Sequence, residues 1–335
     1  VIEQLVSGWL SGRDLSKTGG LAYRGIDGSV KRTPIPIPPD IDETSYVELE
    51  LLNEWQRYVN ADIQGYCEAI SSGFWLPIAR GCKYDCVHCG GGNQVYCLLT
   101  GRHEMGVRSA QRVADDIVKL RAKGIEVVKL SHDPQLMGER YYTDLFHDVK
   151  RSGIDISVYF ESFGLPSLDL VKKLVKTFTF CKVAISPESA SERVRTMAGR
   201  SFTDSQFFKA ISMLEQYEVD TDVYFLVGLP GESRESLRLF EPFVRRLSRA
   251  KRTSVEPPFA YAIDPHCPMA IDPGKYGVRL FVKGFEDYVK LSQSDRQVDW
   301  IGHETDSLSR EEVCVFLDEA KKFVSSLPVP ILRRS

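Results

Sequence analysis

The sequence has neither a long apolar run nor a marked excess of charge of either sign. Its longest stretch without Asp, Glu, Lys or Arg, residues 86–101, is rich in Gly, Asn and Gln, whereas a membrane-spanning helix needs about 20 mostly apolar residues. Lys and Arg total 43 and Asp and Glu total 46, giving a net charge of −3, so no overall field favours nucleic acid or an anionic membrane. No basic segment leading into an apolar one follows Val1, so we expect no secretory signal and a cytoplasmic location.

Disulfide-rich, collagenous and disordered classes are also excluded. The 335 residues are 43% hydrophobic and 27% charged, close to the average of globular domains and enough to bury a large core. Three of the eight cysteines fall close together, at Cys82, Cys86 and Cys89. Such clustering in a chain of this size fits metal ligation in a reducing compartment better than a framework of disulfides.

Three regions differ in their patterns. We expect a linker-like N-terminal extension over residues 1–68, an α/β core over 69–270 and a helical C-terminal extension over 271–335. In the first of these, the pattern predicts a short helix over 2–10, a hairpin around a Gly-Ile-Asp-Gly turn and an extended proline-rich segment over 33–39.

The core alternates short apolar runs with segments of helical period. Six runs rich in Val, Ile, Phe and Tyr predict strands, at residues 74–78, 125–130, 154–160, 180–185, 223–227 and about 254–263. Between them, apolar residues recur about every 3.6 positions, and Thr203 with Gln206 predicts a capping box at one helix start. Regular alternation implies a parallel sheet with right-handed crossovers, either an open doubly wound sheet or a complete or partial barrel.

The cysteine cluster directly follows the first predicted strand. Cys82, Cys86 and Cys89 have glycines on both sides that allow the chain to curl around one centre. A structural zinc site or a closed four-iron cluster normally takes four protein ligands, and the local set has three. A four-iron cluster held by three cysteines leaves one iron open to a small molecule. The spacing alone also allows a zinc knuckle with His88 or His103 as the fourth ligand, or three unrelated thiols.

The spacing Cys-x3-Cys-x2-Cys at this position resembles the signature of the radical S-adenosylmethionine (SAM) superfamily. The resemblance implies a partial (β/α)6 barrel in which Cys82, Cys86 and Cys89 ligate a [4Fe-4S] cluster. It also implies that the open iron binds the amino and carboxylate groups of SAM, and that reductive cleavage of SAM yields a 5′-deoxyadenosyl radical that abstracts a hydrogen atom from the substrate. A flavodoxin or ferredoxin would donate the electron, and the substrate is a small molecule or peptide that the sequence does not identify.

The same resemblance implies SAM contacts at the ends of later strands. Residues 184–189 and Arg200 resemble family segments that hold SAM, which assigns the SAM carboxylate to Arg200 and its ribose or amino group to Glu188. The chemistry agrees, since a guanidinium fork suits a carboxylate and a carboxylate suits an ammonium or hydroxyl group. Glu161, ending the third strand, is a further candidate, and His88 occupies a position that lies near the adenine in the family. The alternative is that Arg200 and Glu188 form ion pairs on the surface and do not bind SAM.

Residues 223–233, which contain Val-Gly-Leu-Pro-Gly-Glu, are the most specific match after the cysteines. A glycine at position 228 lets the backbone approach a ligand closely, and in the family this segment packs its main chain against the adenosine, so Gly228 is expected at the cofactor. Tyr224 stands where relatives often carry Asp, so one hydroxyl-binding carboxylate is missing. On the sixth strand, Tyr261 is the candidate for the adenine side.

The residues that act on the substrate are less defined. His132 and Asp133 after the second strand, and Cys267 after the sixth, are the candidates, although residues 131–135 are equally typical of a polar loop. An auxiliary cluster has no support, because no Cys-x-x-Cys pair occurs among the other cysteines, which are Cys67, Cys97, Cys181, Cys267 and Cys314.

Both ends of the chain resemble one branch of the superfamily. Residues 20–39 resemble the linker between a cobalamin-binding domain and a radical SAM domain, and 301–305 and 308–312 resemble tail segments of that class. This favours cobalamin-dependent methyl transfer to carbon, although the nearest match to the cobalamin motif Asp-x-His-x-x-Gly, residues 264–269, has Met269 in place of Gly. A cobalamin-independent oxidoreductase or isomerase and a non-catalytic zinc-stabilised binding module are the alternatives.

Overall fold

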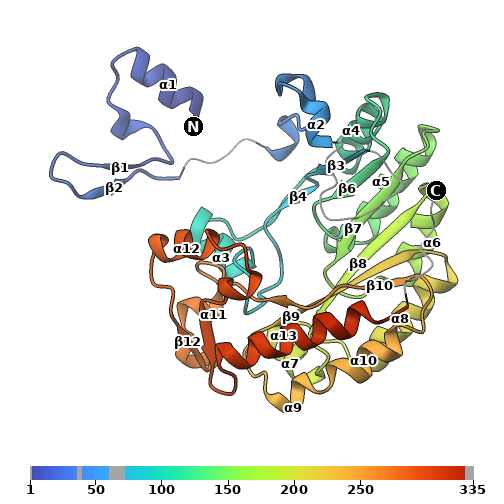
Figure 1. The fold of residues 1–335 in the computed structure, drawn as a ribbon. Helices are drawn as coiled ribbons and strands as arrows, with labels where there is room; N and C mark the ends of the chain where they lie inside the picture. Colours follow the sequence, from blue (N-terminus) through green and yellow to red (C-terminus); the bar gives the residue numbers. More distant parts are fainter. Residues whose placement is uncertain (1, 36–39, 60–71, 329–335) are drawn as a thin grey trace.

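The structure is a computed structural model that describes residues 2–35, 40–59 and 72–328 (Figure 1). Cys67 and the domain boundary expected at residue 68 lie outside these residues. Within the described ranges, no helix has both the length and the apolar character that crossing a membrane requires.

A seven-stranded parallel sheet forms the centre of the described chain (Figure 1). Its order is β10-β9-β8-β7-β6-β3, with β11 also paired to β9. The strands are β3 (Gly73–Leu76), β6 (Val127–Leu130), β7 (Ser157–Ser162), β8 (Cys181–Glu188), β9 (Asp220–Val227), β10 (Thr253–Val255) and β11 (Phe259–Ala260). Strands that follow one another in the sequence are neighbours in the sheet, as parallel strands with helical crossovers require. The prediction of an α/β fold with a partial (β/α)6 barrel is confirmed.

The sixth predicted strand is divided into two short pieces. Where the sequence predicts one strand over 254–263, β10 and β11 are separated by residues 256–258, Glu-Pro-Pro. Proline has no N–H to donate to a neighbouring strand, so the pairing stops and resumes. Both pieces pair with β9, Val255 beside Val223 and Phe259 beside Leu226.

The helices between the strands cover one face of the sheet (Figure 1). They are α4 (Ala110–Ala122), α5 (Glu139–Arg151), α6 (Leu168–Thr177), α7 (Glu192–Ala198), α8 (Asp204–Gln216), α9 (Arg234–Leu237) and α10 (Phe240–Leu247). Buried strand residues such as Val128, Phe160 and Val183 share one apolar core with α4, α5, α6, α8 and α10, whereas α7 packs in a second cluster. Because side chains alternate across a strand, Glu161 and Asp222 lie on the opposite face.

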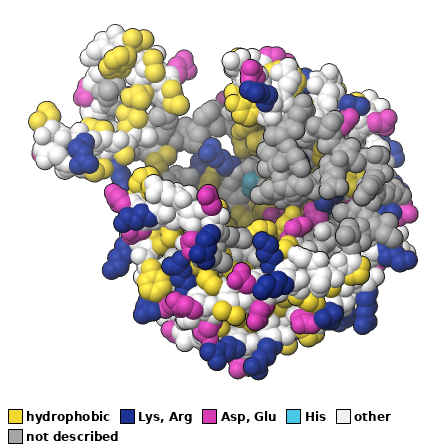
Figure 2. Space-filling model, viewed as in Figure 1, with side chains coloured by type: hydrophobic (Ala, Val, Ile, Leu, Met, Phe, Trp, Pro, Cys, Tyr) yellow, Lys and Arg dark blue, Asp and Glu magenta, His cyan; other side chains and the backbone are white. Residues whose placement is uncertain are grey.

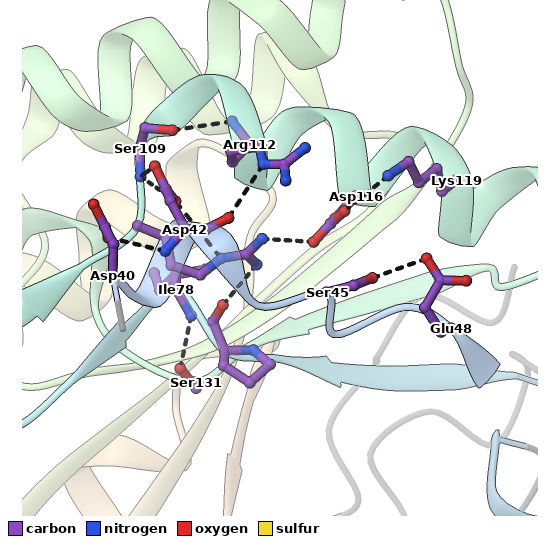
Figure 3. Close-up of polar contacts among 12 residues, drawn as sticks. Asp40, Asp42, Ser45, Glu48, Ile78, Ser109, Arg112, Asp116, Lys119 and Ser131 are labelled. Carbon is purple, nitrogen blue, oxygen red and sulfur yellow. Dashed lines mark hydrogen bonds and ion pairs between the residues drawn. The ribbon is translucent and has the colours of Figure 1, made fainter. Parts of the chain in front are cut away.

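Part of the N-terminal extension is attached to the barrel by charged residues (Figure 3). The extension contains α1 (Ile2–Leu10) and the hairpin of β1 (Ala22–Arg24) and β2 (Val30–Arg32), both as predicted. Its short 3-10 helices are η1 (Leu15–Lys17), which lies between α1 and the hairpin, and η2 (Ile41–Glu43) and η3 (Leu49–Leu51), which follow the hairpin and precede α2 (Trp55–Val59). Asp42 accepts hydrogen bonds from the N–H of Ser109 at 2.9 and 3.1 Å. Nearby, Arg108 Nη2 lies 2.6 Å from Asp116 Oδ2, and both side chains are buried. The Nε of the same Arg108 lies 3.9 Å from Asp42 Oδ1, so Asp42 attaches η2 to the start of α4.

The C-terminal extension is helical, as predicted, but also contains a small sheet. Its elements are α11 (Pro268–Ile271), η5 (Pro273–Tyr276), β12 (Val278–Leu280), α12 (Phe285–Ser292), η6 (Gln297–Trp300), β13 (His303–Thr305) and α13 (Arg310–Ser325). The antiparallel pair β12–β13 places Leu280 beside His303. Ile301 and Leu308 on either side of β13 are buried with Val227 of β9, so this extension packs directly on the barrel.

Candidate active site

The three clustered cysteines lie on one curled loop beyond the carboxyl end of β3. The loop connects β4 (Ala79–Arg80) to α3 (Asn93–Thr100), and β5 (Gly106–Val107) pairs with β4 behind it. Backbone N–H groups donate to two of the sulfurs, from Tyr84 to Cys82 at 3.4 Å and from Gly91 to Cys89 at 3.3 Å. Figure 2 shows the molecule hollowed between its N-terminal part and the barrel, with basic and histidine side chains inside the hollow.

The electrostatics of the thiols reflect both their burial and their closeness. Burial raises the pKa of Cys86 to about 11, while the Arg200 guanidinium opposes this rise. Burial also raises the pKa of Cys89, and the neighbouring Cys82 adds to it. Cys86 and Cys89 therefore favour the protonated form until a bound cation draws off their protons.

The three thiols of the loop leave one position of a four-ligand metal site to another donor. Among the described residues, no three or more His, Cys, Asp or Glu side chains are arranged to hold a single metal ion. A single zinc ion draws every thiolate to about 2.3 Å, whereas each thiolate of a four-iron cluster binds a different iron. Of the two histidines weighed as a fourth ligand, His103 instead places Nδ1 3.3 Å from the thiol of Cys97.

Arg200 and Glu188 lie beside this loop, as the sequence predicted for the SAM carboxylate and amino group. Arg200 donates to Glu188 Oε1 from Nη2 at 2.8 Å and from Nε at 3.1 Å, and also donates to the carbonyl of Phe163. Glu188 follows a β-bulge in β8 and has a φ of +68°, a conformation that non-glycine residues rarely adopt. Burial raises the pKa of Glu188, and the Arg200 guanidinium opposes the rise.

His88 and Glu161 complete the group of charged and polar side chains. His88 Nε2 lies 3.7 Å from Glu188 Oε1, and burial lowers the pKa of His88 to about 4, so the ring is neutral near pH 7. Glu161 accepts a 2.6 Å hydrogen bond from Ser186. Burial is also the main cause that raises the pKa of Glu161, and Glu188 adds to it. The four charged or titratable positions predicted from separate strands and loops thus gather at one end of the sheet.

The glycine-rich segment after β9 forms a turn that is stabilised by the side chain of one of its own residues, Glu232. The Glu232 carboxylate accepts hydrogen bonds from the N–H groups of Gly228 at 2.7 Å and Leu229 at 3.1 Å. Gly228 has a φ of +100°, which glycine adopts without the steric cost of a side chain. We call residues 228–232 the strap.

Tyr261 joins the cluster loop to the sixth strand. Its hydroxyl donates to the carbonyl of His88, and the two rings meet edge to face at 5.6 Å. Close by, Asp264 accepts a 2.8 Å hydrogen bond from the N–H of Gly90. Asp264 was not among the predicted site residues, because only the fold brings it to a loop 174 positions earlier.

The three residues predicted to act on the substrate, His132, Asp133 and Cys267, lie in three different environments. His132 lies at the cluster loop, with Nε2 3.1 Å from the carbonyl of Gly81. Asp133 accepts from Gln135 N–H, Ser162 Oγ and Phe163 N–H at 2.8 to 3.2 Å, which is the arrangement of a loop anchor. Cys267 is fully buried next to Tyr261, away from any surface that a substrate could reach in this conformation.

Comparison with known proteins agrees with this geometry. Residues 76–241 match the family model described as the Radical SAM superfamily. An uncharacterized methyltransferase of Pyrococcus horikoshii is 26% identical over 246 residues, covering 73% of this chain and 50% of that protein. An anaerobic magnesium-protoporphyrin IX monomethyl ester cyclase of Rubrivivax gelatinosus is 24% identical over 233 residues, and the match covers 67% of this chain and 38% of the cyclase. The chain thus spans half or less of the length of these curated relatives.

Solved structures show the same fold. The radical SAM methyltransferase TsrM of Kitasatospora setae, solved with tryptophan and a SAM analogue, superposes with a TM-score of 0.61 at 16% identity, over 89% of this chain and 56% of that one. The cobalamin-dependent radical enzyme OxsB superposes with a TM-score of 0.57 at 14% identity, over 82% of this chain and 38% of that one. The family match over residues 76–241 places the chain in the radical SAM superfamily of enzymes, which disfavours a non-catalytic zinc-stabilised module.

Proposed function

We propose that Cys82, Cys86 and Cys89 hold a [4Fe-4S] cluster whose fourth iron binds SAM. The observation that carries this proposal is the position of the three-thiol loop beside the Arg200–Glu188 pair, at the carboxyl end of a parallel sheet. Ligands of parallel α/β folds bind at this end. When bound, the cluster supplies the electron that cleaves the sulfonium of SAM, and a flavodoxin or ferredoxin in a reducing compartment replaces that electron.

The protein side chains orient SAM. Arg200 presents a guanidinium fork to the SAM carboxylate, and Glu188 presents its carboxylate to the amino group or the ribose. The two are paired with each other at 2.8 Å, so a ligand with both charges replaces one ionic contact by two. The strap and Tyr261 lie on the adenosine side, and Glu161 faces the same space from β7. Burial of these groups excludes water, which strengthens each electrostatic contact.

Among reaction types, methyl transfer to carbon with the help of cobalamin is favoured. Its support is that the P. horikoshii relative is named a methyltransferase, that the fold neighbours TsrM and OxsB were solved with bound cobalamin, and that residues 20–39 resemble a linker to a cobalamin-binding domain. A cobalamin-independent oxidoreductase or isomerase is the second candidate. The substrate is a small molecule or a peptide.

Anaerobic reconstitution tests the proposal. The chain with iron, sulfide and a reductant should convert SAM to methionine and 5′-deoxyadenosine, detected by chromatography. Protein that binds one zinc ion and leaves SAM intact contradicts it. Adding hydroxocobalamin to the full-length gene product distinguishes the two reaction types, since a bound corrin spectrum supports methyl transfer and its absence supports the second candidate.

A further inference from the structure

His303 of the C-terminal extension reaches the strap from outside the barrel. It lies on β13, 75 residues after Gly228, and only 1% of its surface is exposed. Residues 301–305 resemble a tail segment of the cobalamin-associated class, but the proposed function gives this histidine no task. Its side chain contacts two parts of the site, Gly228 and Tyr261.

The first contact is a short hydrogen bond to the strap. His303 Nε2 lies 2.6 Å from the carbonyl oxygen of Gly228. A carbonyl oxygen only accepts, so Nε2 carries the proton. Since Glu232 accepts from the N–H of the same glycine, both backbone polar groups of Gly228 are held by buried side chains. A Cβ at position 228 would lie 3.3 Å from His303 Nε2, so the close approach also requires glycine.

The second contact is with the aromatic ring on the adenosine side. The rings of His303 and Tyr261 meet at 5.7 Å and 76°, and the hydroxyl of Tyr261 donates to His88 in the cluster loop. His303 therefore touches the strap directly and the cluster loop through one intermediate residue. Tyr261 itself is joined to the residue before the strap, since its N–H donates to the carbonyl of Val227 at 2.8 Å, so His303 adds a side-chain contact to both partners of an existing strand pairing.

Packing alone does not account for a histidine here. Ile301 and Leu308 already anchor the segment in an apolar cluster with Val227 and Ala260. The second ring nitrogen of His303, Nδ1, is buried without a hydrogen-bond partner among the described residues. Leaving a buried polar atom unpaired costs free energy, so an apolar side chain of similar shape would serve packing better. The hydrogen bond to Gly228 is the interaction that only the histidine supplies.

We propose that His303 is a positioning residue, which fixes the carbonyl of Gly228 so that the strap presents its main chain to the adenosine of SAM. This inference rests on the proposed function. It places the control of adenosine binding in the C-terminal extension, separate from the cysteines that hold the cluster and from Arg200.

Two substitutions separate the hydrogen bond from the packing. H303F keeps a ring against Tyr261 but removes the donor, whereas H303Q keeps an amide N–H near the position of Nε2. Anaerobically reconstituted wild type and both variants are compared by iron content, by thermal unfolding, and by binding of SAM and S-adenosylhomocysteine in calorimetry. We expect H303F to bind both ligands about 5- to 30-fold more weakly, H303Q to bind them within about threefold of wild type, and iron content to be equal in all three.

Each other outcome has a distinct meaning. Equal binding by wild type and both variants shows that His303 only packs, and equal weakening in both variants shows that its hydrogen bond is not the cause; either result overturns the inference. Loss of iron in H303F also overturns it, because the role would then lie in the cluster loop. If the wild type holds no cluster or binds no SAM, the proposed function itself fails, and the inference fails with it.

Discussion

Arg200 and Glu188 form a buried ion pair in which both Nη2 and Nε of the guanidinium contact Oε1 of the carboxylate, at 2.8 and 3.1 Å. Their side chains are only 11% and 5% exposed. A buried pair recovers little of what desolvation costs, and apolar residues of similar size would often be as stable. Its position next to the cysteine loop is therefore best explained by a ligand that carries both charges, as the amino acid end of SAM does.

Substitution R200M should weaken both the fold and SAM binding. Removing one partner leaves the other charge buried, which costs about 3 to 5 kcal/mol of unfolding free energy. The double variant R200M/E188Q removes that unpaired charge, so urea unfolding should show most of the lost stability restored while SAM binding stays weak. Wild-type SAM affinity in the double variant would mean that the pair is purely structural.

Gly199 should tolerate alanine less well than another glycine of similar backbone conformation. A Cβ on Gly199, whose φ is +99°, would lie 3.1 Å from Cys86 Cα, whereas Gly153, with a φ of +69°, has open space around it. Both G199A and G153A should lose about 1 kcal/mol from the strained backbone. G199A should lose a further 1 to 3 kcal/mol, on the order expected for overpacking, and should bind less iron. Equal stability and equal iron in the two variants would contradict this account.

Glu232 should make stability depend on pH near neutrality. Burial raises the pKa of Glu232 from 4.5 to about 7. Between these values the folded chain retains a proton that the unfolded chain has lost, so this contribution is complete below about pH 4.5 and is lost as the pH rises through about 7. The loss approaches about 1.4 kcal/mol for each pH unit in that window.

The variant E232Q isolates this effect, because its amide does not titrate and still accepts from the two strap N–H groups. Chemical unfolding from pH 4.5 to 8 should show wild-type stability falling relative to E232Q as the pH rises. Parallel profiles for the two proteins would show that Glu232 does not hold its proton in the folded state.

The Arg108–Asp116 pair should contribute more to stability than its neighbour (Figure 3). Arg108 is buried 2.6 Å from Asp116, whereas Lys119 reaches the same carboxylate at 3.5 Å from a side chain that is 49% exposed. R108M should cost about 3 to 5 kcal/mol because it strands a buried carboxylate, and K119M about 0 to 1 kcal/mol. Urea denaturation of the two variants measures the difference, and similar losses would refute the assigned roles.

The sequence could predict what local patterns determine. Strand order follows from alternating apolar runs, and the Cys82, Cys86 and Cys89 spacing identifies the cluster loop. Arg200 and Glu188 were each assigned to SAM from their resemblance to family segments, and the ion pair between them at the cluster loop is a finding of the structure. The break between β10 and β11 could also have been predicted, since residues 257–258 are both proline.

Contacts between distant segments could not be predicted in this way. Tyr261 meets the carbonyl of His88 across 173 residues, and His303 meets Gly228 across 75. Neither pairing follows from a residue period or a motif, because the first depends on where the cluster loop meets the end of the sixth strand and the second on how the C-terminal extension packs on the finished barrel. The strands β12 and β13, only three residues each, are too short to leave an alternating pattern.

The central claim is that three cysteine thiolates ligate three irons of a [4Fe-4S] cluster and leave the fourth iron to bind SAM. Electron paramagnetic resonance of the reduced, reconstituted protein tests this claim most directly. We predict about four irons per chain and a cluster signal that changes when SAM is added. C86S should lose this signal, whereas C97S, which alters the thiol beside His103, should keep it. A colourless protein with one zinc ion, or a cluster whose signal is the same with and without SAM, would contradict the account.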